Sequence, residues 1–384
     1  MNRETFALSQ KELQRVEVIS ASVQGELACA RAAELLAITP RHVKRLKARY
    51  RQGSAAALAH ASRGRPGPRR LPERLRERIL RLARTRYAGF NDHHFCEKLL
   101  DNEGISLGRE TLRRLLRSAG LGSPRKRRTP LHRQRRLARA REGEMLLVDA
   151  SLHHWLEDRG PQLTLLGFLD DATRKVLVAE FFPTEDALGY FRLLHRLLRR
   201  YGIPLSLYGD RHGVFVRNDD HWSVEEQLTG KRQPTQFGRA LAQLGITYIA
   251  ANSPQAKGRI ERLWGTFQDR LTSELRLAGA TDLDAANALL RHFLPDYNRR
   301  FGRAPRESET AWRPVPENLD RICCFIYERN VSNDNVAQWD GRRFQIPPQP
   351  QRFSFAGARV QIHESLEGKI SIYHANTKLH HAGG

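Results

Sequence analysis

Residues 249–268 read IAANSPQAKGRIERLWGTFQ, and this stretch decides how the chain around it folds. The β-prone run at 246–250 leads into it and predicts a strand. A helix is predicted after the polar turn, because Ser253 is a favourable N-cap and Pro254, which lacks an N–H, suits the first helical position. The apolar residues that follow recur at helical spacing and predict its buried face, namely Ile260, Leu263, Trp264 and Phe267.

The same helix would place Lys257, Glu261 and Gln268 close to one face. A carboxylate one turn after a lysine, near the start of a helix that follows a strand, suits a metal-dependent nuclease, which must place such groups beside a phosphate. A solvated Lys–Glu pair on a helix surface is the simpler interpretation. The positions of the other acids therefore decide between the two.

Charge is distributed very unevenly along the 384 residues. The formal net charge is +23, and residues 1–142 hold 34 Lys and Arg against 13 Asp and Glu, whereas residues 143–384 hold 31 against 29. A basic N-terminal third joined to a nearly neutral remainder is typical of a nucleic-acid-binding part attached to another activity. There is no apolar run long enough for a membrane span and no signal-peptide core, so a cytoplasmic protein associated with the nucleoid is expected. The four cysteines fit neither a disulfide framework nor a zinc pattern.

Residues 26–51, within a predicted module at 1–52, have the pattern of a helix-turn-helix. A first helix would bury Ala28, Ala32, Leu35 and Leu36, and Thr39 and Pro40 would start the second. Four basic side chains are left outward on that second helix, as a helix entering the major groove requires, and we predict that they contact DNA: Arg41, Lys44, Arg45 and Lys47. A basic helical hairpin without DNA-binding function remains the alternative.

A second helix-turn-helix module is predicted at 71–120, after a Gly/Ala/Pro-rich basic linker at 53–70. Its last helix, opened by Ser106 and closed by Gly120, would direct Arg109, Arg113 and Arg114 toward DNA. Two tandem modules would cover an extended duplex site. A basic connector at 121–142 follows and is expected to track phosphates.

The composition changes at Glu144, and residues 143–312 predict an α/β domain. Strands are expected at 145–148, 163–169 and 175–182, then a helix at 184–201, a strand at 203–208, a helix at 235–244, a strand at 246–250 and the helix from Pro254. Three meandering strands followed by alternating helices and strands are the order of a ribonuclease H-like fold. A small antiparallel β-barrel is expected at 330–377, with a hairpin turn at 339–342. The predicted fold class is thus multidomain α+β.

Three acids fall at the ends of core elements in this scheme. Asp149 would end the first strand, Asp210 would end the fourth, and Glu261 lies on the helix after the fifth. The first and fourth strands of such a sheet are neighbours, so the carboxylates would converge. Three clustered carboxylates repel one another unless cations neutralise them, and hard oxygen ligands suit Mg²⁺ or Mn²⁺. We expect two ions, which would clamp the attacking and leaving oxygens of a phosphodiester.

Other polar residues are given simpler roles. Asp170 and Asp171 are expected to serve a hairpin turn, Asp219 and Asp220 to be solvated, and Glu274 lies too far along its helix to share the site of Glu261. His212 and Lys257 are candidates for phosphate contacts, with a solvated side chain as the alternative for each.

The chain resembles bacterial insertion-sequence transposases of the DDE class, which have a retroviral-integrase-type core. The resemblance spans residues 26–375 and is most specific at VDAS (148–151), YGDRHG (208–213), TQFGRAL (235–241) and SPQAKGRIERLWGTFQ (253–268). It implies that Asp149, Asp210 and Glu261 are the catalytic, metal-binding triad and that Lys257 contacts DNA. It also implies transposon-end and target DNA as partners and a homo-oligomer assembled on DNA.

The sequence departs from this family pattern in one place. Between Asp210 and Glu261 lie 50 residues, more than is usual in the family, and the surplus falls in the polar segment 215–234. That segment is predicted to lengthen a surface loop without moving the triad. A non-catalytic DNA-binding repressor derived from a transposase is the alternative function. A nuclease for RNA–DNA hybrids would leave two tandem DNA-reading modules unexplained.

Overall fold

The computed structural model describes residues 9–59, 71–122, 137–230, 232–251, 258–350 and 352–383. The chain divides into two compact units, Met1–Glu77 and Arg78–Gly384. No helix in the described part of the chain is both long and apolar enough to cross a membrane.

The first unit contains three α-helices, α1 (Gln10–Gln24), α2 (Cys29–Leu35) and α3 (Pro40–Gly53), and a short 3₁₀ turn, η1 (Ala55–Leu58). The Thr39 hydroxyl accepts a hydrogen bond from the His42 N–H at 3.3 Å, so the predicted start of α3 is confirmed. The predicted inward face of α2 is partly wrong. Ala28 and Leu35 are exposed, whereas Ala32 is buried as predicted. Ala32 and Ala33 belong to one core with Ile19 of α1, a helix that the helix-turn-helix pattern did not include.

The boundary between the units falls inside α4 (Glu73–Arg84), and the second unit continues with α5 (Asp92–Asp101) and α6 (Arg109–Ser118). These three helices are called the trihelical segment. α6 starts after Gly108 rather than at Ser106. Gly120 has the positive φ of +73° expected of the residue after a helix end, and the Leu121 N–H donates to the Leu116 carbonyl. Leu112, Leu115 and Leu116 are buried, as predicted.

A five-stranded sheet with the order β3-β2-β1-β4-β5 forms the centre of this unit. β1 (Met145–His153), β2 (Leu163–Asp170) and β3 (Val176–Phe182) are antiparallel, and β4 (Ser206–Gly209) and β5 (Thr247–Ala250) extend the sheet in parallel with β1. The predicted order of elements is confirmed as far as the helix that carries Glu261, with one helix added inside it, α8 (Val224–Thr229). The long helix at 283–301 that follows was not predicted either. The predicted end of the first strand at Asp149 is wrong, because β1 continues to His153 by pairing with β2.

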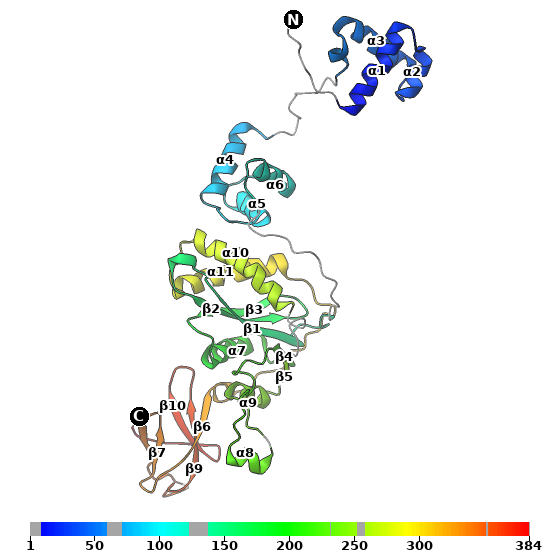
Figure 1. Cartoon of the computed structure of the whole chain (residues 1–384). Helices are drawn as coiled ribbons and strands as arrows, with labels where there is room; N and C mark the ends of the chain where they lie inside the picture. The colour runs from blue at the N-terminus through cyan, green and yellow to red at the C-terminus, as the bar shows by residue number, and fades with distance from the viewer. Residues whose placement is uncertain are drawn as a thin grey trace. The chain divides into compact units, whose positions relative to one another are not determined.

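Helices cover both faces of this sheet (Figure 1). α7 (Ala187–Tyr201) and α9 (Gln236–Gln243) pack on the face that carries Leu146 and Val148, and α10 (Ile260–Leu277) and α11 (Leu283–Phe301) pack on the face that carries Met145 and Leu147. Alternate residues of β1 thus point to opposite layers. The described part of α10 begins at Ile260, after a turn at 258–259. Ser253, Pro254 and Lys257 lie outside the described residues, so the predicted helix start is not described.

The C-terminal region follows the short helix α12 (Leu319–Ile322). β6 (Phe325–Asn330), β9 (Arg359–Glu364), β10 (Ile370–His374) and β11 (Thr377–Leu379) form one antiparallel sheet, and β7 (Val336–Trp339) and β8 (Arg342–Gln345) form a separate hairpin. The hairpin turn at Asp340 and Gly341 is confirmed, and both residues have positive φ.

The predicted closed β-barrel is not confirmed. Both sheets share one apolar core, which includes Phe344, Phe355 and Ile362. Among the described strands, however, the ladders of hydrogen bonds do not join into a ring. An isolated bridge pairs Gln345 of the hairpin with Ala382, three residues after the end of β11, and it belongs to neither ladder.

Candidate active site

The pairing of β1 with β4 brings two of the three candidate acids to the same level of the sheet. Leu147 of β1 pairs with Tyr208 of β4, and both side chains belong to the core under α10 and α11. The two acids each follow this pair by two residues, Asp149 inside β1 and Asp210 directly after the end of β4 at Gly209. Because side chains alternate between faces, Asp149 points toward α10, as Leu147 does.

The negative charge of this region acts on two tyrosines, the buried Tyr190 and the half-buried Tyr248. Burial raises the pKa of Tyr248, and the nearby charges of Asp210 and Asp149 raise it further. The pKa of Tyr190 is raised by burial, by Glu185, to which its hydroxyl donates at 2.7 Å, and again by Asp149 and Asp210. Since both aspartates act on the same two phenols, Asp149 and Asp210 lie in one electrostatic environment.

Asp210 is held by neighbouring backbone and ring groups. Its Oδ1 accepts from the His212 N–H at 2.9 Å, and its carbonyl oxygen accepts from the Tyr248 hydroxyl at 2.5 Å. The His212 imidazole lies 3.6 Å from the Glu185 carboxylate, so this candidate for a phosphate contact has an intramolecular partner.

Asp149 is held by Trp264 of α10. Its indole N–H donates to Asp149 Oδ2 at 3.0 Å. The ring lies over Gly167, the residue of β2 that pairs with Asp149, and a Cβ at Gly167 would stand 3.1 Å from the Trp264 ring. The sequence identified Trp264 only as part of a buried helical stripe. Its position three residues after Glu261 was the available signal for a role at the site.

Glu261 lies in the first turn of α10, exposed, one helical turn before Trp264. It is therefore about 4.5 Å along the helix axis from the residue that contacts Asp149. Within the described residues, no three His, Cys, Asp or Glu side chains are close enough to hold a metal ion together. Asp149 and Asp210 thus lie in one region of the structure, and Glu261 lies on the helix above them. In the described residues the three carboxylates do not form a complete metal-binding cluster.

Asp170 and Asp171 have the structural role predicted for them, and the structure extends it. Both are fully buried at the β2–β3 turn. Asp170 accepts from the N–H and hydroxyl of Thr173, both at 2.7 Å, and from the Gly143 N–H at 3.0 Å. Asp171 accepts from the Arg139 N–H and forms an ion pair with Arg259, directly before α10. This turn therefore fixes the start of the helix that carries Glu261.

The 215–234 segment is more ordered than the predicted surface loop. Phe215 is buried in the core against Tyr190 and Phe237. Glu226 of α8, also buried, pairs with Arg217 and accepts from the N–H groups of Ser223 and Gln233. Asp219 and Asp220 are exposed, as predicted. Asp219 is paired as well as solvated, because hydrogen bonds from Arg217 lower its pKa to about 2.

The predicted DNA contacts differ in their surroundings. Arg41, Lys44 and Arg45 are exposed on α3. Lys47 is partly buried, and its ammonium group donates to the Ser22 carbonyl at 2.5 Å. The prediction that Lys47 faces outward is therefore wrong, because Ser22 in the last turn of α1 supplies an acceptor within reach of this side chain.

On α6, Arg109, Arg113 and Arg114 are exposed, and Arg113 and Arg114 pair with Glu110. Hydrogen bonding to Arg113, followed by the charges of Arg113 and Arg114, lowers the pKa of the Glu110 carboxyl to about 2. Lys257 lies outside the described residues.

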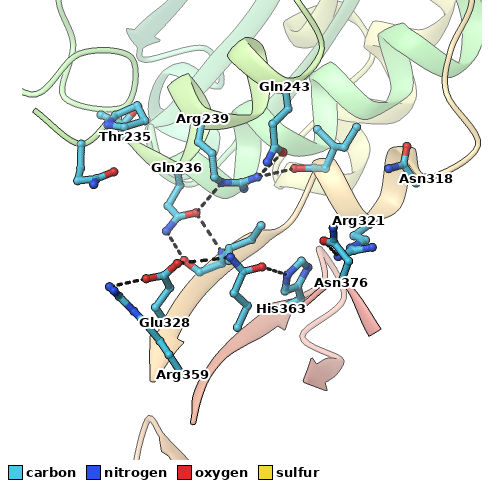
Figure 2. A pocket seen from close by; sticks show the side chains of 15 residues that line it. Thr235, Gln236, Arg239, Gln243, Asn318, Arg321, Glu328, Arg359, His363 and Asn376 are labelled. Carbon is cyan, nitrogen blue, oxygen red and sulfur yellow. Dashed lines mark hydrogen bonds and ion pairs between the residues drawn. The ribbon is translucent and has the colours of Figure 1, made fainter. Parts of the chain in front are cut away.

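A groove of about 920 Å³ lies between α9 and the C-terminal sheet (Figure 2). Gln236 of α9 exchanges two hydrogen bonds with the Ile326 backbone, and Arg239 donates to the carbonyls of Ile322 and Cys324. The described residues that line it include none of the three candidate acids. Its polar contacts join the C-terminal region to the core, so it is separate from the candidate site.

Comparisons with known proteins agree with parts of this description. A family model described as a winged helix-turn-helix matches residues 15–77. The chain is 37% identical over 370 residues to "Putative transposase y4bF" of Sinorhizobium fredii, covering 96% of this chain and 79% of that protein. It is 28% identical over 415 residues to "Transposase for insertion sequence IS1202" of Streptococcus pneumoniae, covering 96% of this chain and 87% of that protein.

Among solved structures, an intasome of simian T-cell lymphotropic virus in complex with a PP2A regulatory subunit aligns over 79% of this chain and 96% of that chain. The alignment has 12% identity and a TM-score of 0.33. At this TM-score the alignment does not establish a shared fold. The relationship therefore rests on the two sequence relatives.

Proposed function

Because the chain belongs to the transposases of bacterial insertion sequences, we propose that it cuts and joins DNA at a site built from Asp149, Asp210 and Glu261. The single observation that carries the proposal is the β1–β4 register. Asp149 and Asp210 each follow the Leu147–Tyr208 pair, which lies in the core under α10, by two residues, and this supports a shared site with Glu261 of that helix.

The chain's own residues would prepare this site in three ways. Trp264 orients Asp149 through its indole N–H, and the backbone at His212 orients Asp210. The ion pair between Arg259 and the buried Asp171 fixes the start of α10. Side chains held by such contacts do not need to reorganise during a reaction, which favours catalysis.

The donor set fits divalent cations. Carboxylate oxygens are the ligands that Mg²⁺ and Mn²⁺ prefer, and the two aspartates already share one negative field. Asp149, Asp210 and Glu261 would hold two ions, which would supply charge stabilisation at the attacking and leaving oxygens of a phosphodiester. The proposal requires Glu261 to join the two aspartates when DNA and metal bind.

Two reactions would take place at this site. Water would attack a phosphodiester at the transposon end, forming a new P–O bond, and the 3′-oxygen would leave and take up a proton. The 3′-hydroxyl so released would attack a phosphodiester of target DNA, expelling that strand's own 3′-oxygen. Neither reaction needs a covalent protein–DNA intermediate.

The partners would be transposon-end and target DNA, bound by a homo-oligomer. Arg41, Lys44 and Arg45 on α3 would contact the element's end, and Arg109, Arg113 and Arg114 on α6 would extend the contact along the duplex. Their exposure leaves them accessible to phosphates and bases. Lys257, just before α10, would contact DNA next to the cut.

The test uses the full chain, Mg²⁺ or Mn²⁺, and a labelled duplex that carries the DNA flanking this reading frame, scored on a denaturing gel. Asp149→Asn, Asp210→Asn and Glu261→Gln should each abolish cleavage and strand transfer, and combining them should cost little more because they act as a unit. DNA binding should persist. Asp284→Asn, which neutralises an exposed acid in the first turn of α11, is the matched control and should leave cleavage unchanged.

Full cleavage by the Glu261→Gln protein would remove α10 from the active site and overturn the proposal. The competing function is that of a DNA-binding repressor without chemistry. It is favoured by one observation, the lack of a finished three-acid cluster in the described residues. A wild-type protein that binds the duplex but never cuts it in either metal would decide for the repressor.

A further inference from the structure

A layer of charged side chains joins α5 of the trihelical segment to α10 of the core. Arg270 of α10 makes two parallel hydrogen bonds to Glu97 of α5, at 2.7 and 3.1 Å, and its side chain is only 9% exposed. Arg300 of α11 reaches the same carboxylate at 3.2 Å. Such a two-pronged Arg–carboxylate contact fixes orientation as well as distance.

A second cluster one turn further along α10 has the opposite arrangement of charge. Glu274 of α10 accepts from Lys98 at 2.6 Å and contacts His94 at 2.7 Å, both of α5, and the His94 side chain is 3% exposed. On α5, the acid Glu97 therefore meets a base of α10, and the next residue, the base Lys98, meets an acid of α10. A displaced docking would bring like charges together, so the alternation specifies one register between the helices.

The contacts span the whole length of α5. At its start Asn91 donates to Asp269 of α10 at 2.8 Å, and at its end Asp101 accepts from Arg300 of α11 at 2.9 Å. Several pairs are shielded from water, which weakens screening by salt. α5 is therefore held at both ends and in the middle.

The same α10 carries the candidate site at its other end. Glu261 and Trp264 lie in its first turns, and Arg270 follows Glu261 by nine residues, about 14 Å along a continuous helix. α6 packs on α5, where Arg117 pairs with Asp92 at 2.6 Å, and it leaves Arg109, Arg113 and Arg114 exposed. A chain of packed elements thus runs from the α6 arginines to Glu261.

We propose that this interface makes α5 and α6 a fixed part of the catalytic domain, so that DNA held on α6 meets the active site at one set spacing. Lys98, Glu97, Arg270 and Glu274 are then positioning residues that determine which phosphodiester is cut. The inference rests on the proposed function. It adds that the place of the cut depends on the α5–α10 contact.

The experiment reverses one ion pair and then restores it. Lys98→Glu and Glu274→Lys each place like charges together, whereas the double variant restores an opposite pair, with the His94 ring able to accept from the new lysine. Arg299→Gln, which removes an exposed neighbour on α11, is the control. The full chain would be tested on the labelled flanking duplex for binding and for the position of each cut.

Each single variant should bind the duplex within about threefold of wild type and cut at the wild-type phosphate at least tenfold less, with new cuts at neighbouring positions. The double variant should recover at least half of the correct cuts. Rescue by the swap separates positioning from a loss of folding. If the reversals do not fold, Lys98→Gln, which removes the charge without reversing it, is compared with wild type for binding and for the position of each cut.

Hydrogen exchange provides a readout that does not need cleavage. Adding the duplex should slow exchange of the α10 amides in the wild type and not in Lys98→Glu. Single variants that cut at the wild-type position and rate, with unchanged α10 protection, would overturn the inference. A wild-type protein without any cleavage, but with α10 protection that depends on Lys98, would instead count against the proposed function alone.

Discussion

At the scale of single residues, acids that look alike in the sequence have different surroundings. Asp170 is enclosed by three hydrogen-bond donors, and burial nevertheless raises the pKa of its carboxyl. Asp149 is partly accessible, and its Oδ2 accepts from the Trp264 indole. A fully buried carboxylate whose oxygens are saturated by backbone donors supports a turn, whereas a partly accessible one that a side chain orients can still receive a ligand.

Trp264→Phe tests that orienting contact. An aromatic ring remains with part of the packing, but Asp149 loses a donor, so cleavage should fall about 10- to 100-fold, as is typical when an outer partner of a metal ligand is removed. Trp155→Phe is the matched control, because its indole N–H donates at 3.1 Å to a backbone carbonyl, that of Ser151. Both variants should lose about 1 kcal/mol of stability in urea unfolding, and only Trp264→Phe should lose activity. Equal activity in the two would contradict the role given to Trp264.

Lys47 and Arg45, two residues apart on α3, should separate stability from DNA binding. Lys47→Met removes the hydrogen bond to Ser22 and should lower the thermal stability of the N-terminal unit while the salt dependence of DNA affinity is unchanged. Arg45→Ala should leave stability unchanged and reduce the slope of log affinity against log salt by about 0.9 for each phosphate that the variant no longer neutralises. The opposite pattern in filter-binding and melting curves would restore Lys47 as an outward DNA contact.

At the scale of elements, the segment around α8 is a small polar fold attached to the core. Replacing residues 217–233 with a Gly/Ser linker should leave the core stable while impairing strand joining. The reason is that α8 exposes two apolar side chains, Val224 at 74% and Leu228 at 83%, which are available to contact DNA or a second subunit. Extending the replacement to Phe215 should also cost about 3–5 kcal/mol of stability, since Phe215 is in the core. Joining assays and urea unfolding of both proteins provide the check. Unchanged joining by the shortened chain would make the segment a spacer.

The C-terminal sheet should lose stability in mild acid because of His363. Burial, assisted by the charges of Arg321 and Arg239, lowers the pKa of His363 to about 4. The unfolded chain therefore takes up this proton first, near pH 6.5, so the stabilisation is complete above about pH 6.5 and is lost as the pH falls to about 4, by about 3 kcal/mol.

The measurement is urea unfolding of the full chain at the two ends of that pH window. His363→Gln should reduce the difference in the free energy of unfolding between the two pH values. His380→Gln, which changes an exposed histidine in the same region, should not. An equal pH dependence in wild type and His363→Gln would exclude this histidine as the cause.

At the scale of the whole molecule, the basic first third of the sequence, residues 1–142, is divided between the two structural units. The helices of the Met1–Glu77 unit have their own apolar core, whereas α5 is bound through charged contacts to α10 and α11. A fragment of residues 1–77 should therefore fold alone and bind duplex DNA with steep salt dependence. A fragment of residues 1–142 should bind too, but should unfold its second segment at a lower temperature than the full chain does. Salt-independent binding by the 1–77 fragment would contradict the assignment of DNA binding to this unit.

The sequence by itself determined the local features of this protein. The order of strands and helices in the core, the start of α3 at Thr39 and Pro40, and the turn at Asp170 and Asp171 could all be predicted. Each depends on hydrophobic periodicity or on a side chain bonding to backbone a few residues away. The same reasoning put Asp149 and Asp210 at the ends of neighbouring strands, and β1 and β4 do pair in parallel, in a register that reaches Leu147 and Tyr208, two residues before each acid.

Only the tertiary structure decided which partner each surface meets. Periodicity shows that a residue is covered but not by what, so it did not identify Ser22 as the acceptor for Lys47 or Trp264 as the partner of Asp149. The pairing of Glu97 with Arg270 joins residues 173 positions apart, and no local pattern specifies a contact of that range. β1 likewise continues beyond Asp149 because β2 supplies hydrogen bonds up to His153, and the position of an acid within a strand depends on that distant partner.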